Sequence, residues 1–233
     1  MSRTEDSEKT AADRPPRAGR RPSRRAVLLG GAATLAGLGG GAYLARDELT
    51  RWWWRLPGNR VERVPGAVDQ PGAEWVPAAP GNYLEADRPY DFEIDRVVIH
   101  VVQGSYETAL RVFQDPDHEA AAHYVVRARD GRLAQTVREL DVAYHAGNFR
   151  YNLRSVGIEH EGFVDRPEDF TDAMYRSSAR LTADVCGRYG IPVDREHIVG
   201  HSEVPGADHT DPGRHWDWDR YLRLVAAARK DPG

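Results

Sequence analysis

The chain contains nine histidines, and three of them stand where a catalytic site could be assembled. His100 lies within a run of β-branched residues, and His201 directly follows a short apolar segment. His209 precedes Asp211 by two residues. Histidine is the most common metal ligand in proteins, and two histidines with an aspartate at the ends of different strands would suit zinc. No local motif such as H-E-x-x-H supports a zinc site, so buried structural histidines remain the alternative on spacing alone.

Four segments around these residues have the patterns of strands. Residues 96–102 (RVVIHVV) are a short β-branched run, which predicts a buried strand. Residues 124–128 and 133–137 flank an Asp-Gly dipeptide, which is the turn signal of a β-hairpin. Residues 155–161 (SVGIEHE) alternate between faces as a strand does. Together these segments predict one central sheet.

Two later segments have helical patterns. Residues 171–189 place apolar side chains at core-facing spacings, with Thr171 as a candidate N-cap and Gly190 as the stop. Residues 217–229 form a second candidate helix. Strands mixed with helices predict an α/β or α+β domain built around the sheet.

The N-terminal segment has the features of an export signal. Residues 26–45 contain no charged side chain and are bracketed by Arg25 and Arg46. A helix of this length rises about 30 Å, which is enough to cross the hydrocarbon core of a bilayer. The adjoining sequence SRRAVL resembles a twin-arginine export signal. We therefore expect residues 1–45 to be a twin-arginine signal peptide or a membrane anchor.

Composition divides the rest of the chain. Residues 46–90 are rich in proline and glycine, which predicts an irregular linker or a strap over the surface of a domain at residues 91–229. The tryptophan triplet 52–54 would lie at a membrane surface if the preceding segment is retained, or else pack on the domain. The net charge of −4 argues against a nucleic-acid partner, which would require a basic patch. The single cysteine, Cys186, excludes an internal disulfide.

Five motifs occur in order between residues 95 and 221. They read VVIHVVQG, AAHYVVRARDGRLAQTV, YHAGN, SVGIEHEGF and VGHSEVPGADHTDPGRHWDW. In this order they resemble the N-acetylmuramoyl-L-alanine amidase family that is related to the peptidoglycan recognition proteins. The resemblance implies an α/β fold with a single central mixed β-sheet flanked by helices, and a zinc amidase catalytic domain over residues 91–229. The implied reaction is hydrolysis of the amide bond between the lactyl group of N-acetylmuramic acid and L-alanine of the peptidoglycan stem peptide.

The same resemblance assigns roles to individual residues. It implies zinc ligands at His100, His201 and Asp211, which leave one coordination position open for water as in catalytic zinc sites. Glu159 in the GIE motif matches the catalytic acid of the family, and we expect it to act as general base. His209 stands where many relatives have lysine, and its N–H would donate to the oxyanion of the tetrahedral intermediate.

Three further residues are expected to lie close to the substrate. This sequence has Ala122 where relatives often have tyrosine, which leaves more of the transition-state contact to His209. The adjacent His123 is expected to contact substrate or to have a structural role. His145 and Asn148 of the YHAGN motif are expected to line the groove for the peptide or the muramyl group.

Peptidoglycan or a soluble muropeptide is the substrate that this resemblance implies. We expect an exported monomer that is extracellular or associated with the cell wall, and anchored in the membrane by residues 26–45 if that segment is retained. A non-catalytic peptidoglycan-binding module of the same fold is the alternative, but such a module would lack a ligand, whereas His100, His201 and Asp211 are all present. A zinc peptidase that cuts within the stem peptide would need a different arrangement of motifs.

Overall fold

The computed structural model describes residue 56 and residues 61–230 of the chain. The predicted export segment at residues 26–45 and the tryptophan triplet at 52–54 lie outside the described residues. Within the described part, no helix is long and apolar enough to cross a membrane.

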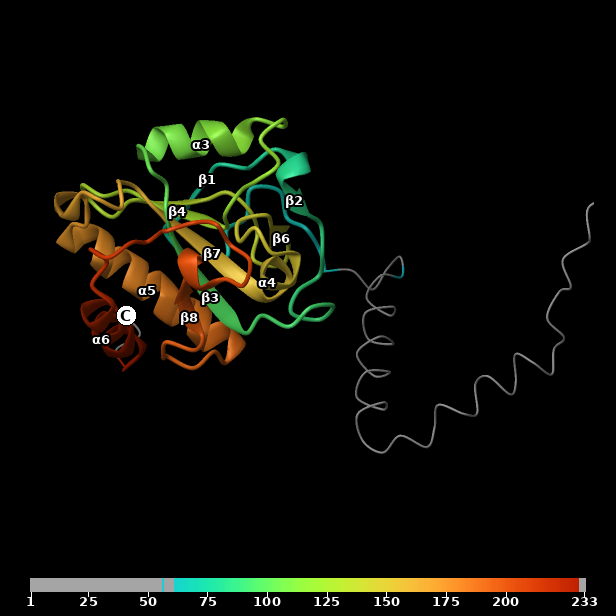
Figure 1. Ribbon diagram of the computed structural model, residues 1–233. Coiled ribbons are helices and arrows are strands. Elements are labelled where there is room, and N and C mark those ends of the chain that lie inside the picture. The colour runs from blue at the N-terminus through green and yellow to red at the C-terminus, as the bar shows by residue number, and fades with distance from the viewer. Residues whose placement is uncertain (1–55, 57–60, 231–233) are drawn as a thin grey trace, which may run out of the picture. The chain divides into compact units, whose positions relative to one another are not determined.

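A six-stranded mixed sheet forms the centre of the domain, which confirms the predicted fold class (Figure 1). In spatial order its strands are β1 (Glu74–Trp75), β5 (Leu133–Gln135), β4 (Tyr124–Val126), β7 (Ser155–His160), β3 (Arg96–Val101) and β8 (Ile198–Gly200). Strands β4, β7, β3 and β8 are parallel, whereas β5 is antiparallel to β4 and forms the predicted hairpin with it. The parallel strands therefore bring their carboxyl ends to one edge of the sheet.

Helices cover both faces of this sheet (Figure 1). They are α3 (Tyr106–Gln114), α4 (Phe149–Arg154), α5 (Asp172–Tyr189) and α6 (Trp218–Lys230). Helices α5 and α6 pack on one face and α3 packs on the other. Val97 and Ile99 of β3 and Ile158 of β7 join the core beneath α5. Because side chains alternate along a strand, His100 and Glu159 point to the opposite face.

Both predicted helices are present, and local sequence explains where α5 begins and ends. Thr171 accepts a hydrogen bond from the Met174 N–H at 3.2 Å, and Gly190 ends the helix with a φ of 70°, a left-handed conformation that favours glycine. The sequence patterns did not predict the shorter helices α3 and α4. Helix α3 has only nine residues, and its buried side chains, such as Tyr106 and Phe113, form a narrow stripe.

Residues 61–90 form a strap along the domain. Strand β1 pairs in parallel with β5, and β2 (Tyr83–Leu84) pairs with β6 (Val142–Ala143). Composition could not distinguish a linker from a strap, because long-range pairing decides between them, and the described residues form the strap. The domain therefore continues across the boundary that we expected at residue 91.

Asp69 fixes this strap to the sheet. Its carboxylate accepts hydrogen bonds from the Arg138 guanidinium at 2.7 Å and from the Glu139 N–H at 2.7 Å. Burial raises the pKa of the Asp69 carboxyl, but these donors outweigh burial and hold the pKa below its ordinary value. Ionised Asp69 therefore stabilises the fold above the pKa of the unfolded chain, and this stabilisation is lost as the pH falls through the folded-state pKa.

We expect Asp69→Ala to lower the free energy of unfolding by about 2 kcal/mol at pH 7, as loss of charge-assisted hydrogen bonds does. The difference from wild type should shrink as the pH falls below about 4, where the unfolded chain binds the proton. Urea titrations at pH 7 and pH 3 measure both effects. The control is Glu74→Ala, which removes an exposed ion pair with Arg132 and should cost less than about 1 kcal/mol. Equal losses for the two variants would contradict the anchoring role of Asp69.

Candidate active site

The carboxyl ends of β3, β7 and β8 hold the predicted site. His100 on β3 and Glu159 on β7 are partners in the parallel register, so their side chains are neighbours on one face. His201 directly follows β8, which pairs with the other side of β3. Asp211 comes from the loop before α6, and its Oδ2 accepts a hydrogen bond from the Val101 N–H at 3.2 Å. The fold thus gathers these four predicted residues from separate segments of the chain.

The side chains of His100, His201 and Asp211 converge closely enough to hold one metal ion. His100 Nδ1 lies 3.4 Å from Asp211 Oδ2, and His201 Nδ1 lies 3.2 Å from Asp211 Oδ1. The edge of a tetrahedron with typical zinc–nitrogen bonds is roughly 3.3 Å. All three residues are buried, and their ligand atoms converge within 4.8 Å of one another. Three such ligands leave a fourth coordination position, as in catalytic zinc sites.

The protonation states of His100 and Asp211 suit a cation. Burial is the main cause that lowers the pKa of His100 to about 4, so its imidazole is neutral at pH 7. Burial acts in the opposite direction on Asp211, but the two histidines hold the pKa of this carboxyl well below its usual range. Neutral imidazole and ionised carboxylate are the forms that bind a metal. The site therefore offers nitrogen lone pairs and one negative charge at a buried point.

Glu159 is partly exposed, but its Oε2 atom is buried and receives no hydrogen bond from the described residues. Burial, and then the negative charge of Asp211, raise the pKa of Glu159 well above its ordinary value. A bound cation would act in the opposite direction, because positive charge favours the ionised form. Glu161 differs, since its oxygens accept hydrogen bonds from the N–H groups of Tyr106 and Ala128. Of these two carboxylates, only Glu159 therefore has an oxygen that no described protein group engages.

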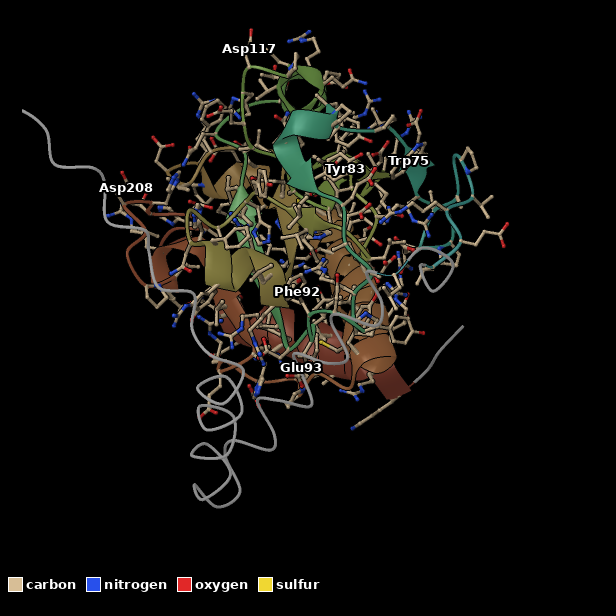
Figure 2. All side chains as sticks on the ribbon, turned by 90° about the vertical axis from the view of Figure 1, so that its right-hand side faces the viewer. Trp75, Tyr83, Phe92, Glu93, Asp117 and Asp208 are labelled. Atoms are coloured by element: carbon tan, nitrogen blue, oxygen red, sulfur yellow. The ribbon has the colours of Figure 1, made fainter. Side chains whose placement is uncertain are left out.

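A cavity of about 730 Å³ opens onto these residues. Its lining includes Glu159, His201 and Asp211. Its walls come from α3 and from the loops at 118–121 and 208–210. Figure 2 labels Asp117 and Asp208, which mark these two loops at the surface. Sequence reasoning missed the wall formed by α3, although its buried residues repeat at helical spacing.

His209 lies at the edge of this cavity. Its ring stacks on that of His201 with 4.0 Å between the centroids, and its Nδ1 lies 3.6 Å from Asp211 Oδ1. The side chain of His209 is 56% exposed, so a ring nitrogen can meet a substrate in the cavity. The structure thus brings His209 next to the predicted metal ligands.

His145, one of the residues predicted to contact substrate, lines the cavity. Both of its ring nitrogens nevertheless have protein partners: Nδ1 lies 2.9 Å from His100 Nε2, and Nε2 lies 3.0 Å from Ser155 Oγ. Burial lowers the pKa of His145 well below its ordinary value, so the ring is neutral. The sequence analysis did not predict that Ser155 contacts His145. The one signal in the sequence was the position of Ser155 at the start of the SVGIE motif, which also contains Glu159.

His123 and Asn148 do not line the cavity. His123 is fully buried next to β4, and its Nδ1 accepts a hydrogen bond from the Gly157 N–H at 3.0 Å. The Asn148 side chain is the N-cap of α4 and donates a hydrogen bond to the Pro205 carbonyl oxygen. Because both side chains are engaged by protein groups, their contact with a substrate stays a prediction.

Comparison with known proteins identifies relatives of this domain. The N-acetylmuramoyl-L-alanine amidase family model matches residues 90–214. N-acetylmuramoyl-L-alanine amidase A of Achromobacter lyticus is 33% identical over 183 residues, which cover 71% of this chain and 100% of that protein. The 1,6-anhydro-N-acetylmuramyl-L-alanine amidase AmpD of Haemophilus influenzae is 39% identical over 111 residues, which cover 45% of this chain and 58% of that protein.

Solved structures share the fold. The crystal structure of a selenomethionine AmpD derivative matches with a TM-score of 0.57 and 27% identity, covering 71% of this chain and 99% of that one. A mutant structure of PlyL matches with a TM-score of 0.51 at 14% identity, covering 66% of this chain and 98% of that one. The family match spans more than half of the chain and contains every residue of the converging site. The chain therefore belongs to the N-acetylmuramoyl-L-alanine amidase family.

Proposed function

We propose that this amidase depends on zinc and hydrolyses the bond between the lactyl group of N-acetylmuramic acid and L-alanine of the stem peptide. The observation that carries the proposal is the convergence of His100, His201 and Asp211 at a cavity that also contains the unpaired carboxylate oxygen of Glu159. Family membership gives the class of reaction. The proposal adds the metal, the roles of the residues and the substrate.

A muropeptide suits the cavity in size, and the names of two relatives point to the same class of substrate. Its volume of about 730 Å³ falls within the range of roughly 300–1,000 Å³ that is usual for pockets that bind small molecules. The Haemophilus influenzae relative is named for 1,6-anhydro-N-acetylmuramyl-L-alanine, and the Achromobacter lyticus relative for N-acetylmuramoyl-L-alanine. We infer that the muramyl-L-alanine portion of peptidoglycan or of a soluble muropeptide is the substrate of this chain.

The residues around the cavity can carry out this hydrolysis. Bound zinc would polarise the amide carbonyl and lower the pKa of a water molecule toward ~7. Glu159 takes a proton from the attacking water and transfers it to the leaving nitrogen of L-alanine. The carbonyl carbon gains a bond to the water oxygen and loses its bond to nitrogen, which yields a lactyl carboxylate and a free amino terminus. His209 donates an N–H to the carbonyl oxygen as negative charge develops there.

A non-catalytic binding module is the alternative from another functional class. Such a module has no need of metal ligands or of a buried carboxylate oxygen beside them, yet both are present here. A zinc peptidase is distinguished by its products. Mass spectrometry of digested muropeptides should find a new L-alanine amino terminus, whereas a cut inside the stem peptide would refute the amidase reaction.

We also propose export through the twin-arginine route, because Arg24 and Arg25 precede the uncharged run at residues 26–45 and peptidoglycan lies outside the cytoplasmic membrane. Replacing both arginines by lysine should retain the protein in the cytoplasm. Cell fractionation followed by immunoblotting measures this, with replacement of Arg20 and Arg21 as the control. Undiminished export of the Arg24/Arg25 variant would contradict the proposed route. N-terminal sequencing of the exported form then shows whether residues 26–45 are removed.

The metal assignment predicts that zinc binding and rate can be separated. Asp211→Ala should lose about one zinc per chain together with activity, because the site loses its charged ligand. Glu159→Gln should keep zinc but lose about 10²-fold or more in rate, as loss of a general base does. Plasma mass spectrometry of the metal and product analysis measure the two effects. The control His215→Ala removes a histidine outside the cavity, and zinc retained by Asp211→Ala would overturn the site.

The role of His209 predicts a pattern of rates in two variants. His209→Ala should keep zinc and lower kcat by about 10²-fold, as loss of an oxyanion donor does. His209→Lys should recover most of the rate, because an ammonium group also donates an N–H to the developing oxyanion. The kcat and zinc content of the three proteins test this. An unchanged kcat in His209→Ala would show that this residue does not donate to the reacting oxygen.

A further inference from the structure

A line of hydrogen bonds connects the backbone of α4 to His100. Ser155 Oγ lies 2.6 Å from the Tyr151 carbonyl oxygen and 3.0 Å from His145 Nε2. The other nitrogen of His145, Nδ1, lies 2.9 Å from His100 Nε2. The remaining nitrogen of His100, Nδ1, faces Asp211 Oδ2 at 3.4 Å. The line thus ends at the nitrogen that would bind the metal.

The carbonyl group at the start of this line fixes the direction of each hydrogen bond. A carbonyl oxygen only accepts, so the Ser155 O–H donates to Tyr151, and Ser155 Oγ accepts from the His145 Nε2–H. A neutral imidazole has one N–H, so His145 Nδ1 accepts from the His100 Nε2–H. By the same rule His100 Nδ1 would carry no hydrogen in the metal-bound site, so its lone pair would be free to bind a metal held together with Asp211. The reverse order would place a serine lone pair against the Tyr151 carbonyl oxygen.

The position of the His145 ring is itself fixed by its surroundings. A Cβ at Gly157 would lie 2.5 Å from His145 Cγ, so the ring fits over β7 only because residue 157 is glycine. The Asn152 side-chain oxygen accepts hydrogen bonds from the N–H groups of His145 and Ala146 at 3.2 and 2.8 Å. The ring meets that of His100 edge-on, at an interplanar angle of 88°. These contacts fix the position of the His145 ring, and with it the position of the Nδ1 atom that meets His100 Nε2.

We propose that His145 and Ser155 are positioning residues that set the tautomer and the orientation of His100 for metal binding. The inference rests on the proposed zinc-dependent function and assigns His145 to the support of a ligand. Metal-binding histidines commonly donate their second N–H to a fixed acceptor, and loss of that acceptor typically weakens metal binding by about 10–100-fold. Here the acceptor is a second histidine, whose own tautomer depends on a hydroxyl group and a backbone carbonyl.

Zinc affinities of full-length variants, measured by competition with a chromogenic chelator, test this inference. Ser155→Ala should bind zinc about 10-fold more weakly, and His145→Leu about 10–100-fold more weakly. His145→Gln should recover part of the loss, because its amide oxygen can accept from His100 while its NH2 group donates to Ser155. The matched control is Thr182→Ala, which removes a fully buried hydroxyl on α5 that bonds to Tyr221 on α6 and should leave zinc affinity unchanged.

Cobalt in place of zinc gives a readout that does not depend on hydrolysis, since its visible spectrum follows the geometry of the ligands. Ser155→Ala and His145→Leu should alter the spectrum of bound cobalt, whereas Thr182→Ala should match wild type. Thermal melts of the metal-free proteins check folding, and Ser155→Ala decides the test if His145→Leu does not fold. A wild-type protein that binds no zinc would overturn the proposed function. Wild-type affinity and spectrum in Ser155→Ala would overturn the positioning role alone.

Discussion

The Asp211 carboxylate faces the Nδ1 atoms of two buried imidazoles, those of His100 and His201, at 3.4 and 3.2 Å. Burying the lone pairs of a carboxylate and two imidazoles away from water costs free energy, and a cation bound between these groups would offset this cost. The site is therefore stable only within a framework that holds its residues in place. Strand β3, which carries His100, is buried along most of its length and paired on both sides, and so supplies that framework. If the site binds a metal as proposed, metal affinity and folding stability would be coupled for this reason.

Side chains alternate along the strands, so one face of the sheet carries the apolar core and the other carries the residues of the candidate site. Val97 and Ile99 of β3 and Ile158 of β7 pack under α5, while the residues between them, His100 and Glu159, face the other side of the sheet. A slip of one residue would exchange the two faces and bury the polar groups in the apolar core. The packing of the core thus fixes the register that places His100, a proposed metal ligand, beside Glu159, the proposed general base.

Local sequence signals predicted part of this architecture. The N-cap at Thr171, the glycine at position 190 and the Asp-Gly turn of the hairpin depend on nearby residues, and the structure has all three features. Helix α3 was missed, and the choice between a linker and a strap stayed open, because contacts with distant segments stabilise both. His100 and His201 converge because β3 pairs with β8. The spacing of these histidines in the sequence could not show whether they are metal ligands or buried structural residues. Only the order of the five motifs favoured metal ligands. The partners of His145 lie 10 and 45 residues away, beyond the reach of any local pattern.

Arg88 connects the strap at residues 61–90 to the hydrogen bonds that link Ser155, His145 and His100. This side chain is only 2% exposed, and its guanidinium donates to the carbonyl oxygens of Glu139 and Ser155. Burial lowers the pKa of Arg88 to about 10, which still leaves it charged at neutral pH. The Ser155 carbonyl oxygen accepts a hydrogen bond from Arg88, and the Ser155 hydroxyl donates one to the Tyr151 carbonyl oxygen. Ser155 therefore contributes both to the position of the strap and to the proposed tautomer of His100. A segment with the composition of a linker therefore supports the proposed metal site, although none of its described residues lines the cavity.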